Sequence, residues 1–130
     1  MTTANLPEAP PEATTPTQML VDASFLFVQG YPIAAGMYAR AALEGRLDDL
    51  CELHDCQPSP KALKHAGIGR RIDALRKTRA LDKATIAEAV RLAGVANEVV
   101  HCMTDDAAVV ENLLTDVRQF LDATEEGGAS

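Results

Sequence analysis

Four polar residues on the apolar faces of two predicted helices are the best candidates for chemistry in this sequence. With about 100° between successive residues of a helix, Arg40 and Glu44 fall on the apolar stripe of residues 32–54. Asn97 falls within an apolar stripe of residues 82–101, and His101 lies at its edge. An imidazole transfers protons and a guanidinium binds phosphate, so their convergence would make a candidate catalytic site.

The spacing of these residues leaves two interpretations open. Each pair is separated by four positions, so its side chains are neighbours on the helix. One interpretation is a buried polar network that fixes helix register, and the other is a polar site in a cleft or at a dimer seam. Both predict that Arg40 and Glu44 are buried together near Asn97 and His101. We favour a structural His101, with its ring enclosed and bonded to the backbone or to Asn97.

A basic cluster offers a second kind of site. Eight of the twelve Lys and Arg residues lie between Lys61 and Lys83, although the chain as a whole carries a net charge of −7. Because that charge repels nucleic acid on average, this segment alone would have to hold an anion or an acidic partner. The alternative is a solvated helix face. The predicted binding residues are Arg70, Arg71, Arg76, Lys77 and Arg79.

The cysteines indicate a reducing compartment and not a metal site. Cys51, His54 and Cys56 lie close together, but their spacing matches no common zinc motif, so we predict no metal site and no cofactor. Three cysteines without a signal peptide favour reduced thiols in a cytoplasmic protein. No apolar run approaches the length of a membrane span, so we predict no membrane partner.

The elements that must position these residues are predicted to be helices. The chain is 47% hydrophobic but only 4% aromatic, a composition that suits closely packed helices better than a sheet. Apolar spacing and caps predict helices at about 17–29, 32–54, 68–78 and 82–101, and a last one after Thr104. We therefore predict an all-α antiparallel bundle of four to five helices, formed by residues 17–123, with disordered tails at 1–16 and 124–130. The apolar stripes place Met37 and Val90 among the inward-facing residues.

The order of the polar motifs resembles a known family. Residues 31–44 begin Tyr-Pro-Ile-Ala-Ala and end Arg-Ala-Ala-Leu-Glu, residues 68–81 contain an Ile-x-x-Leu core, and residues 95–101 read Val-Ala-Asn-Glu-Val-Val-His. In this order they resemble the motifs of a family of HEPN-like bacterial domains of unknown function, and residues 105–123 are similar to its closing helix. The resemblance covers roughly residues 18–123.

The resemblance implies a helical bundle, often a homodimer. In the wider HEPN group, an Arg and a His a few residues apart form a metal-independent endoribonuclease site across a dimer. Here the nearest upstream Arg of the same helix is Arg91, roughly 15 Å from His101 along the helix axis, so that arrangement is absent and Arg40 would have to replace the cation. Ala96 also stands where the family usually has Gly.

These departures favour a non-catalytic function. We expect a dimeric binding or regulatory module that engages RNA, a nucleotide or a protein partner through the basic segment and the face of Asn97 and His101. The alternatives are a metal-independent endoribonuclease of a phage-defence or toxin system, and a purely structural adaptor.

Overall fold

The expected all-α fold is confirmed in the computed structural model, which describes residues 14–57, 67–102 and 104–125. All regular structure within these ranges is helical. The five helices are α1 (Pro16–Val28), α2 (Pro32–Leu53), α4 (Ile68–Lys77), α5 (Lys83–His101) and α6 (Ala107–Ala123). The predicted break at 57–60 lies mostly outside the described residues.

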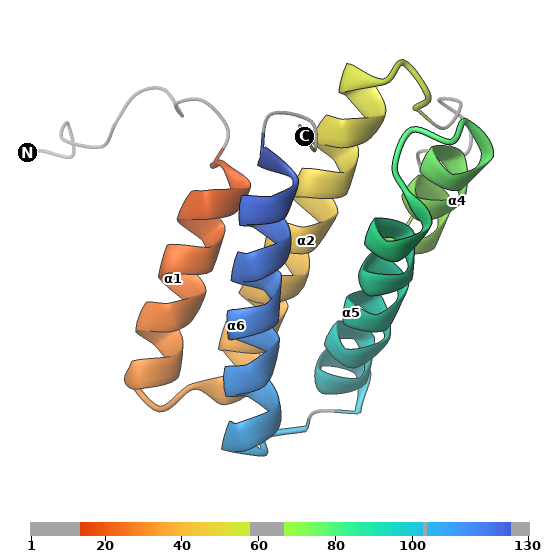
Figure 1. The fold of residues 1–130 in the computed structure, drawn as a ribbon. Helices are drawn as coiled ribbons and strands as arrows, with labels where there is room; N and C mark the ends of the chain where they lie inside the picture. Colours follow the sequence, from red (N-terminus) through yellow and green to blue (C-terminus); the bar gives the residue numbers. More distant parts are fainter. Residues whose placement is uncertain (1–13, 58–66, 103, 126–130) are drawn as a thin grey trace, which may run out of the picture.

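The helices form a bundle around α2. Among the described helices, α2 contacts all four others, whereas α4 contacts α2 and α5. In Figure 1, α1 and α5 run in the opposite direction to α2 and α6. Because α2 and α5 pack against each other, they bring the two predicted polar stripes together.

Side-chain caps begin three of the helices. Thr15 accepts a hydrogen bond from the backbone N–H of Gln18, and Asp82 does the same for Thr85. Asp106 caps α6, which starts at Ala107, so Asp105 and Asp106 precede the first turn instead of lying within it as predicted.

Three helices end in the same kind of turn. After α1, α2 and α4, the chain takes one residue of positive φ, namely Gly30 (93°), Asp55 (54°) and Arg79 (57°). The next residue donates its N–H back to a carbonyl five positions earlier, the pattern of a Schellman motif. Glycine is the usual residue at such a position, so Asp55 and Arg79 hold a conformation that disfavours a side chain.

Small residues make the contact between α2 and α5. The buried face of α2 includes Ala35, Gly36 and Ala39, and that of α5 includes Ala96 and Val99. A Cβ atom added at Gly36 would overlap Cγ1 of Val99, so the two backbones approach more closely there than any side chain at position 36 permits. The remaining core is mostly aliphatic, as the low aromatic content predicts, with Phe120 as its buried aromatic residue among those described.

Two residues predicted to face inward are instead exposed. The exposed fractions are 53% for Met37 and 47% for Val90. The reason is that α2 and α5 are apolar around much of their circumference, and their small alanines select the buried face. A stripe drawn through the larger apolar residues is therefore rotated away from the true interface.

The ends of the bundle extend slightly beyond the predicted domain. Pro16, expected in the N-terminal tail, is the first residue of α1, and Thr124, expected in the C-terminal tail, is buried with its hydroxyl donating to the Phe120 carbonyl. The rest of the predicted tails, residues 1–13 and 126–130, lies outside the described residues. None of the described helices has both the length and the apolar character to cross a bilayer.

Candidate functional site

Arg40 and Asn97 meet across the α2–α5 interface. Arg40 Nε donates a hydrogen bond of 2.8 Å to Asn97 Oδ1, and both side chains are half-buried. The predicted proximity of these two residues, which lie 57 positions apart in the chain, is therefore confirmed. The contact holds the guanidinium against α5 in a defined orientation.

Glu44 belongs to a different cluster, so its expected pairing with Arg40 is wrong. Its Oε2 accepts a 3.1 Å hydrogen bond from Arg71 Nη1, and Asp48 Oδ1 accepts another of 3.1 Å from Arg71 Nε. Arg71 Nη1 also contacts the Gly67 carbonyl oxygen at 3.4 Å. The Arg71 side chain is 11% exposed, so this cluster ties α2 to α4 from inside the bundle.

Sequence reasoning missed Asp48 as a partner in that cluster. Asp48 lies four positions after Glu44, so both carboxylates occupy the same side of α2. That spacing, with a basic segment next in the chain, was the available signal. A helical wheel cannot give the second half of the answer, namely that this side of α2 faces α4 rather than α5.

His101 is exposed, which overturns the expectation of an enclosed ring. It is the last residue of α5, and Cys102 beside it is exposed as well. His101 lies at the edge of an apolar stripe, but this does not bury the side chain because α5 ends at this residue. His101 lies one helical turn, about 6 Å along the axis, from Asn97. An accessible imidazole is able to exchange protons with a ligand.

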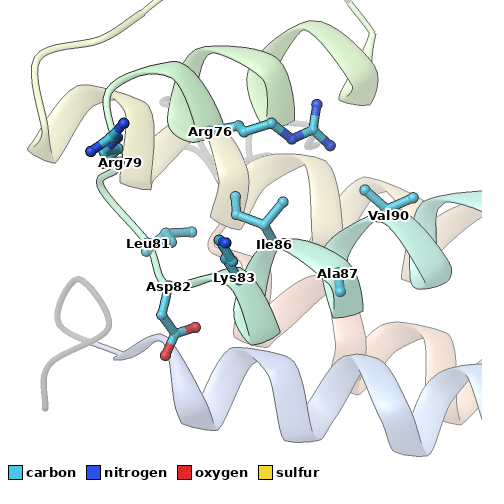
Figure 2. Close-up of a pocket in the computed structure, with 8 residues that line it drawn as sticks. All are labelled: Arg76, Arg79, Leu81, Asp82, Lys83, Ile86, Ala87 and Val90. Atoms are coloured by element: carbon cyan, nitrogen blue, oxygen red, sulfur yellow. The ribbon is translucent and has the colours of Figure 1, made fainter.

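A groove runs from the end of α4 into the first turns of α5 (Figure 2). Its volume is about 950 Å³. Three cations lie along it, Arg76, Arg79 and Lys83, and the other lining residues are Leu81, Asp82, Ile86, Ala87 and Val90. The groove thus combines an apolar floor with a positively charged rim.

The rim charges reach different parts of the groove. Figure 2 shows Arg76 extending over the side of Ile86 and Val90, whereas Arg79 lies at the opposite end beside Leu81. Arg76 also pairs with Asp73 at 2.9 Å, but both side chains are more than half exposed, which keeps that pair weak.

The acidic residue of the groove, Asp82, is occupied by a structural role. Its carboxylate accepts a 2.8 Å hydrogen bond from the backbone N–H of Thr85 and so caps α5. Hydrogen bonding to Thr85 lowers the pKa of Asp82, which keeps it ionised at neutral pH. The groove nevertheless keeps a surplus of positive charge, because three cations face one carboxylate.

The five predicted binding residues divide into three groups. Arg76 and Arg79 line the groove, while Arg70 and Lys77 are exposed beside a smaller hollow of about 200 Å³ on α4. Arg71 lies in the internal cluster with Glu44. Lys61 and Lys64 lie outside the described residues. Sequence reasoning missed the apolar floor because it assigned Val90 to the core.

The cysteine and histidine cluster near the end of α2 does not form a metal centre in the described chain. Across residues 14–57, 67–102 and 104–125, no three His, Cys, Asp or Glu side chains are grouped so as to hold a metal ion. Cys51 is buried within the core and His54 is the C-cap of α2. His65 falls outside the described residues.

Comparison of the chain with family models, curated proteins and solved structures finds no match. The resemblance to HEPN-like domains therefore rests on the sequence motifs described above, and the homodimer that it implies stays a prediction.

Proposed function

We propose that this chain is a non-catalytic binding module that captures an acidic amphipathic segment of a partner protein in the α4–α5 groove. The observation that carries the proposal is the combination of three cations, Arg76, Arg79 and Lys83, with an aliphatic floor. An amphipathic helix would place its apolar face on that floor and its carboxylates on the rim. The complementarity of charge would also speed association.

The composition of the groove favours a protein ligand over RNA or a nucleotide. Single-stranded RNA and nucleotides are commonly held by stacking on aromatic side chains, and among the described residues none that lines the groove is aromatic. The net charge of −7 also opposes a polyanion, which extends beyond the groove and meets the rest of the surface. A short peptide segment is confined to the basic region.

The backbone at Arg79 gives a further argument. Arg79 adopts φ of 57°, where glycine would be more stable by about 1 kcal/mol. An arginine at such a position suggests a use for its side chain that offsets the strain. Its place at one end of the groove makes ligand binding that use.

The proposal is tested by selecting a random peptide library against the whole chain and measuring the affinity of the enriched peptides. We expect peptides with apolar residues at helical spacing and acidic flanks. Arg79→Gly and Lys83→Ala should each weaken binding by about 5- to 10-fold, on the scale of a lost charged contact. Arg79→Gly should also raise the thermal midpoint, so the loss of affinity cannot be attributed to unfolding.

Arg118→Ala is the matched control, because it removes one exposed charge from α6 outside the groove. Its affinity for the peptides should stay within about 2-fold of wild type, as for a surface charge remote from the contact. Peptide enrichment that is indifferent to Arg79 and Lys83 would refute the groove as the site. Tight binding of short single-stranded RNA, lost in the same two variants, would replace the peptide by RNA.

A metal-independent ribonuclease is the second candidate, and the exposure of His101 favours it. The imidazole reaches solvent. Arg40 of α2 is held by Asn97, which lies one turn before His101 on α5. We expect no cleavage of single-stranded RNA in EDTA, since Arg40 is half-buried and already engaged with Asn97. Cleavage by wild type that falls by about 100-fold or more in His101→Ala, but not in Glu98→Ala, would make the chain an enzyme.

Because His101 is exposed, His101→Ala should leave the thermal midpoint nearly unchanged. A loss of cleavage in this variant would therefore not come from unfolding. A purely structural adaptor, the third function considered, predicts neither cleavage nor peptide binding that depends on the groove.

A further inference from the structure

Two cysteines occupy the paired positions of the turn that ends α2. Cys51 lies in the last turn of the helix and Cys56 follows Asp55, the residue with φ of 54°. The backbone N–H of Cys56 donates to the Cys51 carbonyl at 2.9 Å, and that of Asp55 donates to the Glu52 carbonyl at 3.2 Å. In this motif the side chains of the two outer residues turn toward each other.

The two thiols are in contact but differ in accessibility. The Cys56 and Cys51 thiols are linked by a hydrogen bond, and Cys51 Sγ also contacts the Arg71 carbonyl of α4 at 3.6 Å. Cys51 is fully buried, whereas Cys56 is half-buried. Burial, and then the neighbouring Cys56, raise the pKa of the Cys51 thiol to about 12, so Cys51 is protonated at neutral pH.

We propose that Cys51 and Cys56 form a reversible intramolecular disulfide by exchange with a low-molecular-weight disulfide such as oxidised glutathione. The main-chain hydrogen bond holds the two residues together across the turn, and a disulfide needs their Cα atoms to lie about 4.4–6.8 Å apart. The proposal requires that this cap close the bond while α2 keeps its structure. The simpler alternative is an apolar contact of two reduced side chains, which is common in this motif.

The more accessible thiol begins the exchange. The Cys56 thiolate attacks one sulfur of oxidised glutathione, which forms a mixed disulfide on Cys56 and releases one glutathione. Cys51 then loses its proton and attacks Cys56 Sγ, which releases the second glutathione. The protein is oxidised by two electrons, one oxidised glutathione is reduced to two thiols, and the protons pass through solvent to the two leaving thiolates.

The crosslink would be felt at the contact between α2 and α4. Oxidation removes the Cys51 S–H, which is the group that contacts the Arg71 carbonyl. It also fixes the turn at Asp55, which needs positive φ. Since Arg71 belongs to the helix that supplies Arg76 to the groove, the redox state of the cysteines is coupled to the position of α4.

The experiment uses the full chain with Cys102→Ser, because Cys102 is exposed and would otherwise be modified or link two chains. The protein is equilibrated in glutathione buffers of increasing oxidising strength, trapped with acid and cleaved after Glu52. We expect mass spectrometry to find the peptides that carry Cys51 and Cys56 joined by a disulfide. The matched control adds Cys56→Ser, which should abolish the link and leave Cys51 as an unmodified thiol.

Two outcomes would overturn the proposal. One is a Cys102→Ser protein that keeps both thiols or stops at a glutathione adduct on Cys56. The other is a disulfide that lowers the thermal midpoint, because a strained link would show that the folded cap does not hold the two thiols in disulfide geometry. We expect the oxidised protein to melt higher by on the order of 5 °C, since the crosslink constrains the unfolded state.

Discussion

Gly36→Ala is expected to lower the free energy of unfolding by about 1–3 kcal/mol, although alanine is the better helix former by about 1 kcal/mol. The new methyl group would overlap Cγ1 of Val99 on α5 and also approach its Cβ, 3.4 Å away. Either Val99 changes rotamer within a packed interface or α2 and α5 separate, and both cost free energy. Urea unfolding followed by circular dichroism measures the effect.

Gly94 supplies the matched control for this substitution. It also lies within a helix, but a Cβ atom there meets nothing within 4 Å. Gly94→Ala should therefore stabilise the protein by about 1 kcal/mol through helix propensity alone. Equal effects at the two glycines would contradict the close α2–α5 approach.

A double-mutant cycle with Val99→Ala locates the clash. Val99→Ala alone should destabilise, because Val99 is fully buried. It also removes the atom that the new methyl group overlaps, so the double variant should be more stable than additivity predicts by on the order of 1 kcal/mol. Additive effects would place the strain of Gly36→Ala elsewhere.

Arg71→Ala is expected to destabilise the protein by roughly 2–4 kcal/mol, because it removes a nearly buried cation that two partly exposed carboxylates share. Glu44 and Asp48 would then face each other without the cation. The Arg71 side chain is only 11% exposed, so the loss of its apolar stem would also leave a gap between α2 and α4. Asp48 is 43% exposed, which tempers the loss because water screens its charge. Thermal and urea unfolding both measure it.

Arg91 provides a control because it also bridges two carboxylates. Its guanidinium donates hydrogen bonds to Glu88 at 2.7 Å and to Asp116 at 2.8 Å. Both bonds raise the pKa of the guanidinium, and the bond to Glu88 has the larger effect. Its side chain is 50% exposed, so Arg91→Ala should cost less than about 1 kcal/mol. A loss at Arg91 as large as that at Arg71 would show that burial does not govern these clusters.

Helix positions could be predicted from the sequence where apolar and polar faces are distinct. Ile68, Ile72 and Leu75 of α4 are all buried as predicted, and so is the full stripe of α6, namely Val110, Leu113, Leu114, Val117 and Leu121. In α2 and α5 the pattern is ambiguous, because alanine is compatible with either face. Burial of Ala39 and Ala96 instead of Met37 and Val90 follows from close helix approach, a property of the helix pair.

The candidate site was predictable in part for a related reason. A helical wheel gives the direction of a side chain on its own helix, which sufficed to pair Arg40 with Asn97. It does not identify which helix packs in that direction, so Glu44 was assigned to Arg40 when its partner is Arg71. The groove needs the turn at Arg79 to set α4 beside α5, and no local pattern encodes that placement.

The position of α4 at the margin of the bundle has a consequence for local opening. Among the described helices, α2 touches every other one, so its amides are released only when the whole bundle unfolds. Helix α4 touches α2 and α5 alone and has ten residues, so it is the natural unit to detach first. The rim of the groove is thus built partly on the least anchored helix, and a ligand that bridges α4 and α5 would act as an added tether between them.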